Sequence, residues 1–253
     1  MRIRQMFALA TVGTVCLLPL GAAPAFAEDA DLSARLSPVA LSGVPGEGTA
    51  MVNVAGTTLT VTMAASGLLP DSPHAAHIHF GAEARHECPM ASEDANGDSN
   101  LNTTEGGAAY GPIVVSLTKT GDTSPDSALA VDRFDTAPGG KISYERGSIT
   151  VSQEVADAIG TGDSVVVIHG VDHDGSGKYD GSVMSELDPS LPTEATDPAL
   201  CGALNAAPAG GVAAGGGGAA GSPDTGLVLG GAALLALAAG IGVLGARRVR
   251  SES

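Results

Sequence analysis

The sequence predicts an all-β domain, built as an antiparallel sandwich or barrel. Several short segments alternate apolar and polar residues, which is the pattern of strands with one buried face. Clusters of Gly, Asp, Pro and Ser separate these segments, as turns separate strands. Helical periodicity is almost absent. A two-layer or closed antiparallel sheet accounts for this combination with the fewest assumptions.

The first strong signal is a hairpin over residues 51–63, MVNVAGTTLTVTM. Apolar residues alternate on both sides of a Gly-Thr turn, so each arm directs one set of side chains to the same face. Residues 163–171, DSVVVIHGV, form a continuous β-branched run, typical of a strand buried on both faces. A helical turn is indicated only at 152–162. Further alternating stretches are 74–80, 111–117 and 141–152.

Both ends of the chain carry sorting features. Residues 1–27 have a basic start, an apolar run and a small-residue site before Glu28, as in a secretory signal peptide. Residues 227–246 have no charged side chain and precede RRVR, so they can span a membrane with the arginines on the cytoplasmic side. We expect an exported protein that is tethered to the membrane at its C-terminus.

The motif before this span resembles the sorting signal of Gram-positive surface proteins. SPDTG places a Pro-x-Thr-Gly sequence directly ahead of the apolar run, and residues 222–253 form the complete signal. The resemblance implies that a sortase cuts between Thr225 and Gly226 and joins the threonine to peptidoglycan. The Gly/Ala-rich stretch 206–221 has no large side chain to bury and reads as a linker.

Charge and cysteine use fit this location. The formal net charge of −16 disfavours binding to nucleic acid. Residues 28–205 are the length of one ordinary domain. Once the signal peptide with Cys16 is removed, Cys88 and Cys201 remain, and two cysteines in an oxidising compartment predict one disulfide.

The stretch HAAHIHFG holds three of the six histidines of the chain. His77 and His79 are two residues apart and therefore share a face of a strand. His169 ends the buried VVVI run, from which a neighbouring strand could bring it to the same place. Three neutral imidazoles suit copper or zinc. The alternative is a cluster of structural histidines that bind no metal.

HAAHIHFG resembles the copper-binding strand of the Cu/Zn superoxide dismutases. The resemblance continues in order with Cys88, VVVIHG and the LCGAL segment that holds Cys201. It implies a Greek-key β-barrel with copper ligands His77, His79 and His169, and a structural rather than ligating His74.

The chain also departs from that family. It has no histidine between Cys88 and His169, where the family has its zinc ligands and bridging histidine, and Pro198 replaces the arginine that guides superoxide. Enzymatic activity is therefore left open, between a reduced, copper-only dismutase and a copper-binding protein without turnover.

A second resemblance leads to a non-catalytic alternative. Residues 41–81 followed by AYGPIVVSLT are similar to a CHRD (chordin-type) domain, with its His-Ile-His-x-Gly strand and Gly-Pro-Ile-Val strand. That resemblance implies an extracellular structural or adhesion module of the cell wall, in which the histidines need no metal.

Two loops have the oxygen spacing of calcium sites. The first, DANGDSNLNTTE, places oxygen-bearing side chains at positions 1, 3, 5, 7, 9 and 12 of an EF-hand-type loop, and the second, DHDGSGKYD, follows His169 closely. We therefore name calcium as a further possible ligand. The candidate residues are Asp94, Asn96, Asp98, Asn100, Asn102 and Glu105 in the first loop, and Asp172, Asp174 and Asp180 in the second.

Overall fold

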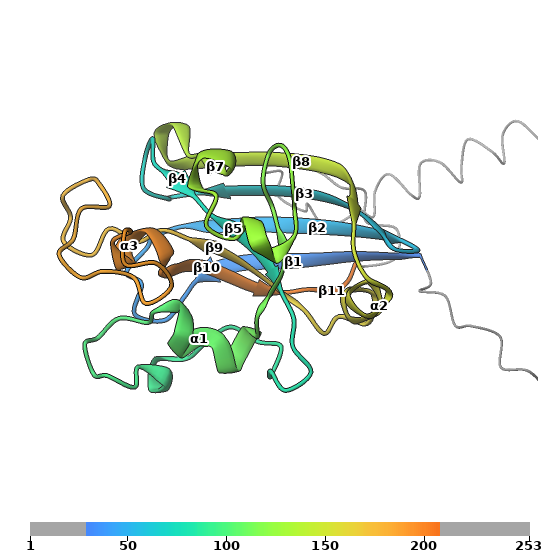
Figure 1. Cartoon of the computed structure of the whole chain (residues 1–253), viewed down its shortest axis with the longest axis horizontal. Helices are drawn as coiled ribbons and strands as arrows, with labels where there is room; N and C mark the ends of the chain where they lie inside the picture. The colour runs from blue at the N-terminus through green and yellow to red at the C-terminus, as the bar shows by residue number, and fades with distance from the viewer. Residues whose placement is uncertain (1–28, 208–253) are drawn as a thin grey trace, which may run out of the picture. The chain divides into compact units, whose positions relative to one another are not determined.

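The computed structural model describes residues 29–207, which fold around a curled antiparallel sheet, a half-barrel (Figure 1). The strand order is β6-β5-β9-β10-β1-β2-β3-β8, with β11 also paired to β1, and β4 and β7 form a separate two-stranded sheet. The all-β prediction is confirmed at this level. The strands are β1 (Ala30–Pro38), β2 (Glu47–Ala55), β3 (Thr58–Ser66), β4 (Pro73–His74), β5 (Ala76–His79), β6 (Ile113–Ser116), β7 (Asp135–Thr136), β8 (Lys141–Thr150), β9 (Val165–His169), β10 (Pro198–Ala203) and β11 (Asn205–Ala206).

The predicted hairpin is formed by β2 and β3. Ala55 pairs with Thr58 across a tight turn in which Gly56 has φ +58°, a conformation that favours glycine. The apolar positions of both arms are buried, as the alternation predicts: Val52, Val54, Leu59, Val61 and Met63.

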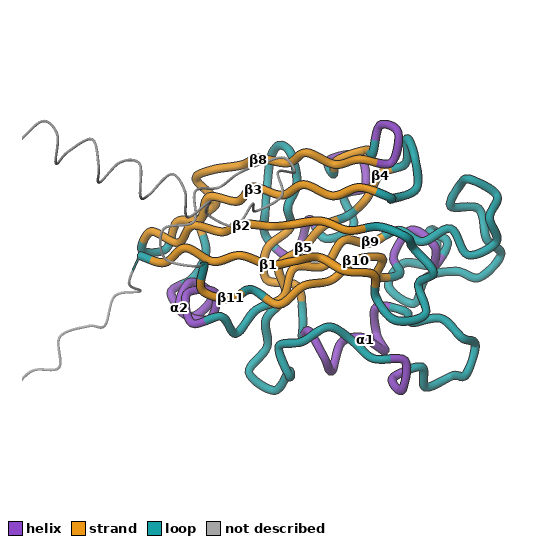
Figure 2. Tube along the Cα trace, turned by 180° about the vertical axis from the view of Figure 1, so that it is seen from behind, coloured by secondary structure: helices purple, strands orange, loops and turns teal. Residues whose placement is uncertain are grey.

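The two edges of the sheet, β6 and β8, are bridged by side chains. Tyr144 of β8 donates its hydroxyl to the carbonyl oxygen of Thr118, just beyond β6, at 3.3 Å. Arg146 donates to the same carbonyl at 2.6 Å and to the Thr118 hydroxyl at 2.8 Å. The curl of the sheet is plain from behind in Figure 2. These side-chain contacts link the two edge strands, which are not paired with each other through their backbones.

Strand β9 is buried on both faces, as its continuous apolar run predicts. Val166 and Ile168 belong to the main core inside the curl, together with Ile78 of β5. Val165 and Val167 point the other way and pack in a smaller cluster with Tyr110 and the disulfide. Both faces of this part of the sheet are therefore covered by protein.

The helices are α1 (Thr103–Tyr110), α2 (Gln153–Thr161) and α3 (Thr193–Thr196). Ala156 and Ile159 of α2 pack in the main core. The predicted helical turn corresponds to α2, which begins after Ser152, whose side chain accepts a hydrogen bond from the amide of Val155, and ends at Gly162 with φ +88°. Helix α1 begins inside the stretch that the sequence suggested to be a calcium loop. Asn102 and Glu105, two of the candidate ligands, form its capping box instead.

The predicted disulfide between Cys88 and Cys201 is present, with a sulfur–sulfur distance of 2.03 Å. Cys201 lies on β10 opposite Val167 of β9. The bond therefore ties the long segment between β5 and α1 to the face of the sheet that carries the smaller cluster.

Several expected features lie outside the described residues. These are the signal peptide 1–27, most of the linker 206–221, and the sorting signal 222–253 with Thr225, Gly226 and the span 227–246. Within residues 29–207, no helix is long and apolar enough to cross a membrane.

Candidate metal centre

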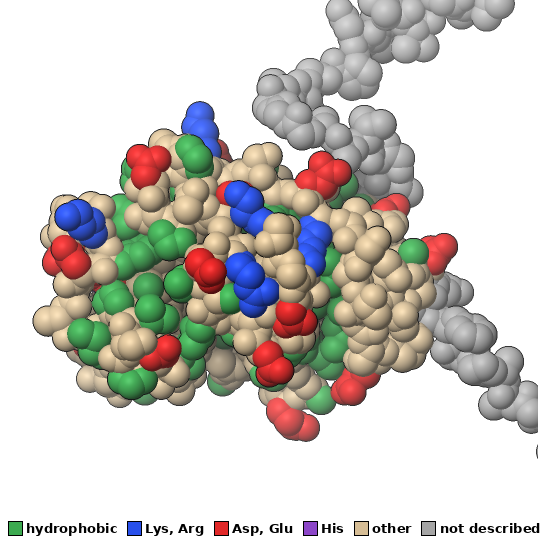
Figure 3. Space-filling model, turned by 45° about the horizontal axis from the view of Figure 1, so that its top comes forward, with side chains coloured by type: hydrophobic (Ala, Val, Ile, Leu, Met, Phe, Trp, Pro, Cys, Tyr) green, Lys and Arg blue, Asp and Glu red, His purple; other side chains and the backbone are tan. Residues whose placement is uncertain are grey.

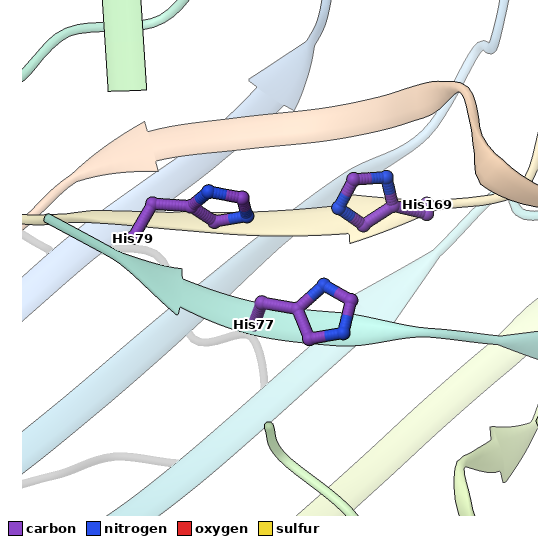
Figure 4. A group of neighbouring side chains, drawn as sticks. All are labelled: His77, His79 and His169. Carbon is purple, nitrogen blue, oxygen red and sulfur yellow. The ribbon is translucent and has the colours of Figure 1, made fainter. Parts of the chain in front are cut away.

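The structure brings His77, His79 and His169 together. Each ring offers one nitrogen, and these three nitrogens all lie within 4.8 Å of one another. Figure 4 shows the rings turned toward a common space from two neighbouring strands. The side chains are 1–2% exposed, and no histidine is visible on the face drawn in Figure 3 outside the grey atoms.

Strand pairing explains the meeting of residues that are distant in sequence. β5 and β9 run antiparallel with His77 opposite Val167 and His79 opposite Val165. In this register His169 falls opposite Ala75, and its amide donates to the Ala75 carbonyl at 2.8 Å. Alternation then places His77, His79 and His169 on one face, the outer face of the curled sheet.

Each ring is fixed by a hydrogen bond from its other nitrogen to a backbone carbonyl. His77 Nε2 lies 3.0 Å from the oxygen of Ala128, His79 Nδ1 lies 2.8 Å from that of Gly111, and His169 Nδ1 lies 2.6 Å from that of Thr196. A carbonyl oxygen can only accept, so the bonded nitrogen carries the hydrogen. The opposite nitrogen of a neutral ring then has a free lone pair.

The three nitrogens that carry these free lone pairs face one another. His77 Nδ1, His79 Nε2 and His169 Nε2 are buried and have no hydrogen-bond partner. Buried polar atoms are normally satisfied, and an unsatisfied one costs about 1–3 kcal/mol. Three such atoms converging on one point is the arrangement expected where a cation completes the site.

Burial also keeps the rings neutral. Desolvation is the largest effect on all three, and it lowers the pKa of His79 to about 3 and that of His169 to about 4. The pKa of His77 falls well below its ordinary value, through burial first and then through His169 and His79. Neutral imidazole is the form that binds a metal.

The donor set fits a transition-metal ion. Imidazole nitrogens bind zinc at about 2.0–2.1 Å, so two of them on one tetrahedral ion lie about 3.4 Å apart. The nitrogens here are separated by no more than 4.8 Å, so each pair would have to close by at most about 1.4 Å. Three imidazoles held by second hydrogen bonds to carbonyl oxygens suit copper or zinc.

The neighbouring histidines do not join this group. His74 has both ring nitrogens near carbonyl oxygens, those of His169 at 2.8 Å and Leu69 at 3.1 Å, so neither faces the three ligand nitrogens. His86 places Nε2 2.9 Å from the carbonyl oxygen of Gly81 and stacks on Phe80.

Two aromatic side chains line the site. The ring of His79 packs against Tyr110 of α1 with centroids 4.5 Å apart, and His77 packs against Phe134 at 5.3 Å. The Tyr110 hydroxyl donates a hydrogen bond to the carbonyl oxygen of Thr103. These rings exclude water from the histidines without competing for their lone pairs.

The first predicted calcium loop does not form a converging acidic group. Asp94 accepts from the amides of Gly97 and Ser99, and Glu105 accepts from those of Ala95, Asn96 and Asn102. These bonds hold the loop's own turns. Over residues 29–207, two groups of three or more His, Cys, Asp or Glu side chains converge, and neither includes this loop.

The second of those groups includes part of the other predicted loop. Asp172 and Asp174 converge with Glu194, a buried residue that the sequence did not indicate, while Asp180 is not a member. Glu194 accepts hydrogen bonds from the amides of His173, Asp180 and Gly181 at 2.8–3.0 Å. Its carboxylate therefore anchors this loop to α3.

The chain matches no known protein-family model, and no curated protein is significantly similar to it. The structural case for a function therefore depends on the site itself.

Sequence reasoning found the three histidines but missed what orients them. The carbonyls of Gly111, Ala128 and Thr196 come from three segments that cover the sheet, and a carbonyl carries no sequence signature. A partial signal existed only for Gly111, since glycine before proline at the start of GPIVVSL indicates a special backbone conformation.

Proposed function

We propose that this protein binds one copper ion through His77, His79 and His169, in a superoxide dismutase-like Greek-key domain. The observation that carries the proposal is the set of three buried, unpartnered nitrogens, one from each ring. A metal would satisfy all three at once. The resemblance of HAAHIHFG and VVVIHG to copper-binding strands favours copper over zinc.

The proposed activity is metal binding rather than fast dismutation. The zinc ligands, the bridging histidine and the guiding arginine of the resembled family have no counterpart in the sequence. The alternative, a CHRD-like structural module of the cell wall, would leave three buried lone pairs facing one another at a cost in stability. Copper binding distinguishes the two functions.

The test uses residues 28–221, which contain the whole described fold. After loading with Cu(II), we expect one copper per chain in the wild type and loss of tight binding in His77→Ala and in His169→Ala. His86→Ala is the matched control, because His86 lies outside the cluster, and it should retain copper. Equal copper affinity in the wild type and His77→Ala would exclude the proposal.

Superoxide decay measured on the same copper-loaded samples separates binding from catalysis. We expect decay no faster than with the copper-free protein, which is the result for a binding or storage protein. Acceleration that is lost in His77→Ala would instead identify a reduced, copper-only dismutase.

Calcium binding by the two Asp-rich loops stays a prediction. The carboxylates of both loops already accept amide hydrogens, so an ion would have to share those oxygens. A higher melting temperature in calcium than in chelator is the expected sign, since a ligand of the native state must stabilise it. An equal melting temperature in calcium and in chelator would exclude calcium binding.

We further propose that the protein is exported and joined to the cell wall through Thr225. The support is the order of motif, apolar run and arginines in the sequence. Wall-degrading enzymes should release the protein, whereas detergent alone should not. Release by detergent would indicate a membrane anchor instead.

A further inference from the structure

The two edge strands of the curled sheet differ in how they are covered. β6 has four residues, and the segment after it turns back onto it: the Ser116 amide donates to the carbonyl of Thr123 at 2.8 Å, and the Ser116 hydroxyl donates to the carbonyl of Ser124 at 2.9 Å. β8 has ten residues and lies outermost in Figures 1 and 2. Within residues 29–207 its backbone pairs with β3 alone, and its bridge to Thr118 is made by side chains.

This one-sided pairing leaves β8 with a free edge. In an antiparallel pair, alternate residues direct their N–H and C=O groups away from the partner strand, and such a row of free groups is a template for another strand. The regular part of β8 runs from Lys141 to Arg146. Gly147 and Ser148 then form a bulge, where the register with β3 shifts and Ser148 has φ +56°. Because a bulge disrupts further pairing, the edge that can accept a strand is 141–146.

The side chains along this edge are free to meet a second strand. Lys141, Ser143 and Glu145 are exposed, whereas Ile142 and Tyr144 point into the main core. Neither Lys141 nor Glu145 enters an ion pair in the described part of the chain. β8 has two basic residues against one acidic residue, a net charge of +1, in a chain of net charge −16. The acidity that keeps copies of this chain apart is therefore absent along β8.

We propose that β8 is a dimer interface, at which two copies of the chain pair antiparallel through a two-fold axis at Ser143. This register sets Lys141 opposite Glu145 of the second copy, twice over, and Ile142 opposite Tyr144. Opposite charges that face each other across strands stabilise the pair, and like charges destabilise it.

Other two-fold registers along this edge do not match the charges. An axis at Lys141 or at Glu145 sets a like charge opposite itself. An axis at Ile142 or at Tyr144 sets both charges opposite uncharged residues. Because the charge pattern is complementary to itself only about Ser143, it fits a second copy of this chain rather than an unrelated strand. None of the proposed copper ligands lies on β8, so this inference is independent of the copper site.

The experiment uses residues 28–221 without added copper, which contain the whole described fold. Sedimentation equilibrium measures the dimer dissociation constant of the wild type, Lys141→Glu, Glu145→Lys and the double variant that carries both substitutions. The two side chains are exposed and unpaired, so all four proteins should fold, and their melting temperatures check this.

We expect a reversible dimer in the wild type. Each single substitution sets two like-charge pairs across the interface and should raise the dissociation constant at least about tenfold. The double variant restores two opposite-charge pairs and should recover the wild-type value. A wild type that stays monomeric at its highest soluble concentration would overturn the inference, as would equal dissociation constants in all four proteins or a double variant that does not recover.

A crosslink tests the register directly. Ser143→Cys places two cysteines opposite each other at the two-fold axis, so a mild thiol oxidant should convert this variant to a disulfide-linked dimer. Thr62→Cys is the matched control, because Thr62 is exposed on β3 opposite Glu145 and lies one strand away from the edge. It should remain uncrosslinked. Equal crosslinking of the two variants would show that the contact is not β8 with β8.

Discussion

His79 places Nδ1 2.8 Å from the carbonyl oxygen of Gly111, the residue at which helix α1 ends. Gly111 has φ +83°, and a Cβ there would lie 2.8 Å from the amide nitrogen of Gly81 and 2.9 Å from the carbonyl carbon of Phe80. The orientation of one proposed ligand therefore depends on a glycine that no other residue can replace without strain.

Gly111→Ala is expected to lower both the stability and the copper affinity of the protein. The added methyl group must push the chain away from β5, and the carbonyl that holds His79 moves with it. We expect a loss of about 1–3 kcal/mol in the free energy of unfolding and a drop in copper affinity of at least about tenfold, as for other residues that orient metal ligands. Urea denaturation and competition with a copper chelator measure the two effects.

Gly107→Ala is the matched control for that substitution. Gly107 lies within the same helix, and a Cβ there would meet nothing within 4 Å. Alanine is preferred to glycine inside a helix by about 1 kcal/mol, so stability should rise slightly and copper affinity should not change. Similar losses in both variants would show that α1 as a whole, rather than the Gly111 carbonyl, supports the site.

The metal-free protein should lose stability as the pH falls below about 6.5. Burial holds the pKa of His79 at about 3 and that of His169 at about 4 in the folded state, whereas the unfolded chain has the ordinary value near 6.5. Between these values the unfolded state binds more protons, so stability is full above pH 6.5 and declines toward pH 4. Each such histidine contributes about 1.4 kcal/mol per pH unit in that window.

The measurement is urea denaturation of chelator-treated protein at pH 7 and pH 5. His79→Gln removes one of the titrating groups, so its stability should fall less between these two pH values than that of the wild type. An equal fall in both proteins would show that His79 does not stay neutral on acidification.

Loss of the disulfide should destabilise the domain by about 2–5 kcal/mol. The bond joins residues 113 positions apart, and the chain-entropy model gives about 4.7 kcal/mol for a loop of about that length. Replacing both cysteines by alanine should lower the midpoint of urea unfolding. A reductant should lower the midpoint of the wild type only, and a reductant effect on the double variant would point to a different cause.

Arg146→Met should loosen the bridge between the two edges of the sheet. It removes the charged donor that now reaches both the carbonyl and the hydroxyl of Thr118, although Tyr144 still donates to the carbonyl. We expect a cost of about 1.5–3 kcal/mol, as for the loss of hydrogen bonds from a charged group. Amide exchange in residues 117–121 should accelerate. Arg35→Met is the control, because the Arg35 side chain is 80% exposed and its ion pair with Glu47 spans 3.5 Å, so little change is expected.

The sequence predicted those parts of the fold that leave a local pattern. The β2–β3 hairpin, the doubly buried β9 and helix α2 all follow from periodicity or capping residues, and their side chains lie as expected. Strand β1 also alternates, from Ala30 to Pro38, but it was not recognised, and it pairs with residues 48–54 of β2. Helix α1 was missed because Gly106 and Gly107 weaken any helical signal.

The candidate site was predictable in its ligands and not in its surroundings. His77 and His79 share a face by alternation alone. The position of His169 beside them depends on the register between β5 and β9, which the sequence does not reveal. The acidic partner of Asp172 and Asp174 shows the same limit, since Glu194 lies on α3 and becomes a neighbour only after folding. Contacts that form only in the tertiary structure leave no characteristic spacing of residues in the sequence.

The three histidines project from the outer face of the curled sheet, while the main core fills the inner face. Strand pairing thus sets the spacing of the three rings. The orientation of the rings is set by the three segments that carry the carbonyls of Gly111, Ala128 and Thr196. Exchange of any one of those segments should therefore change the reactivity of the proposed copper site more than it changes the packing inside the sheet.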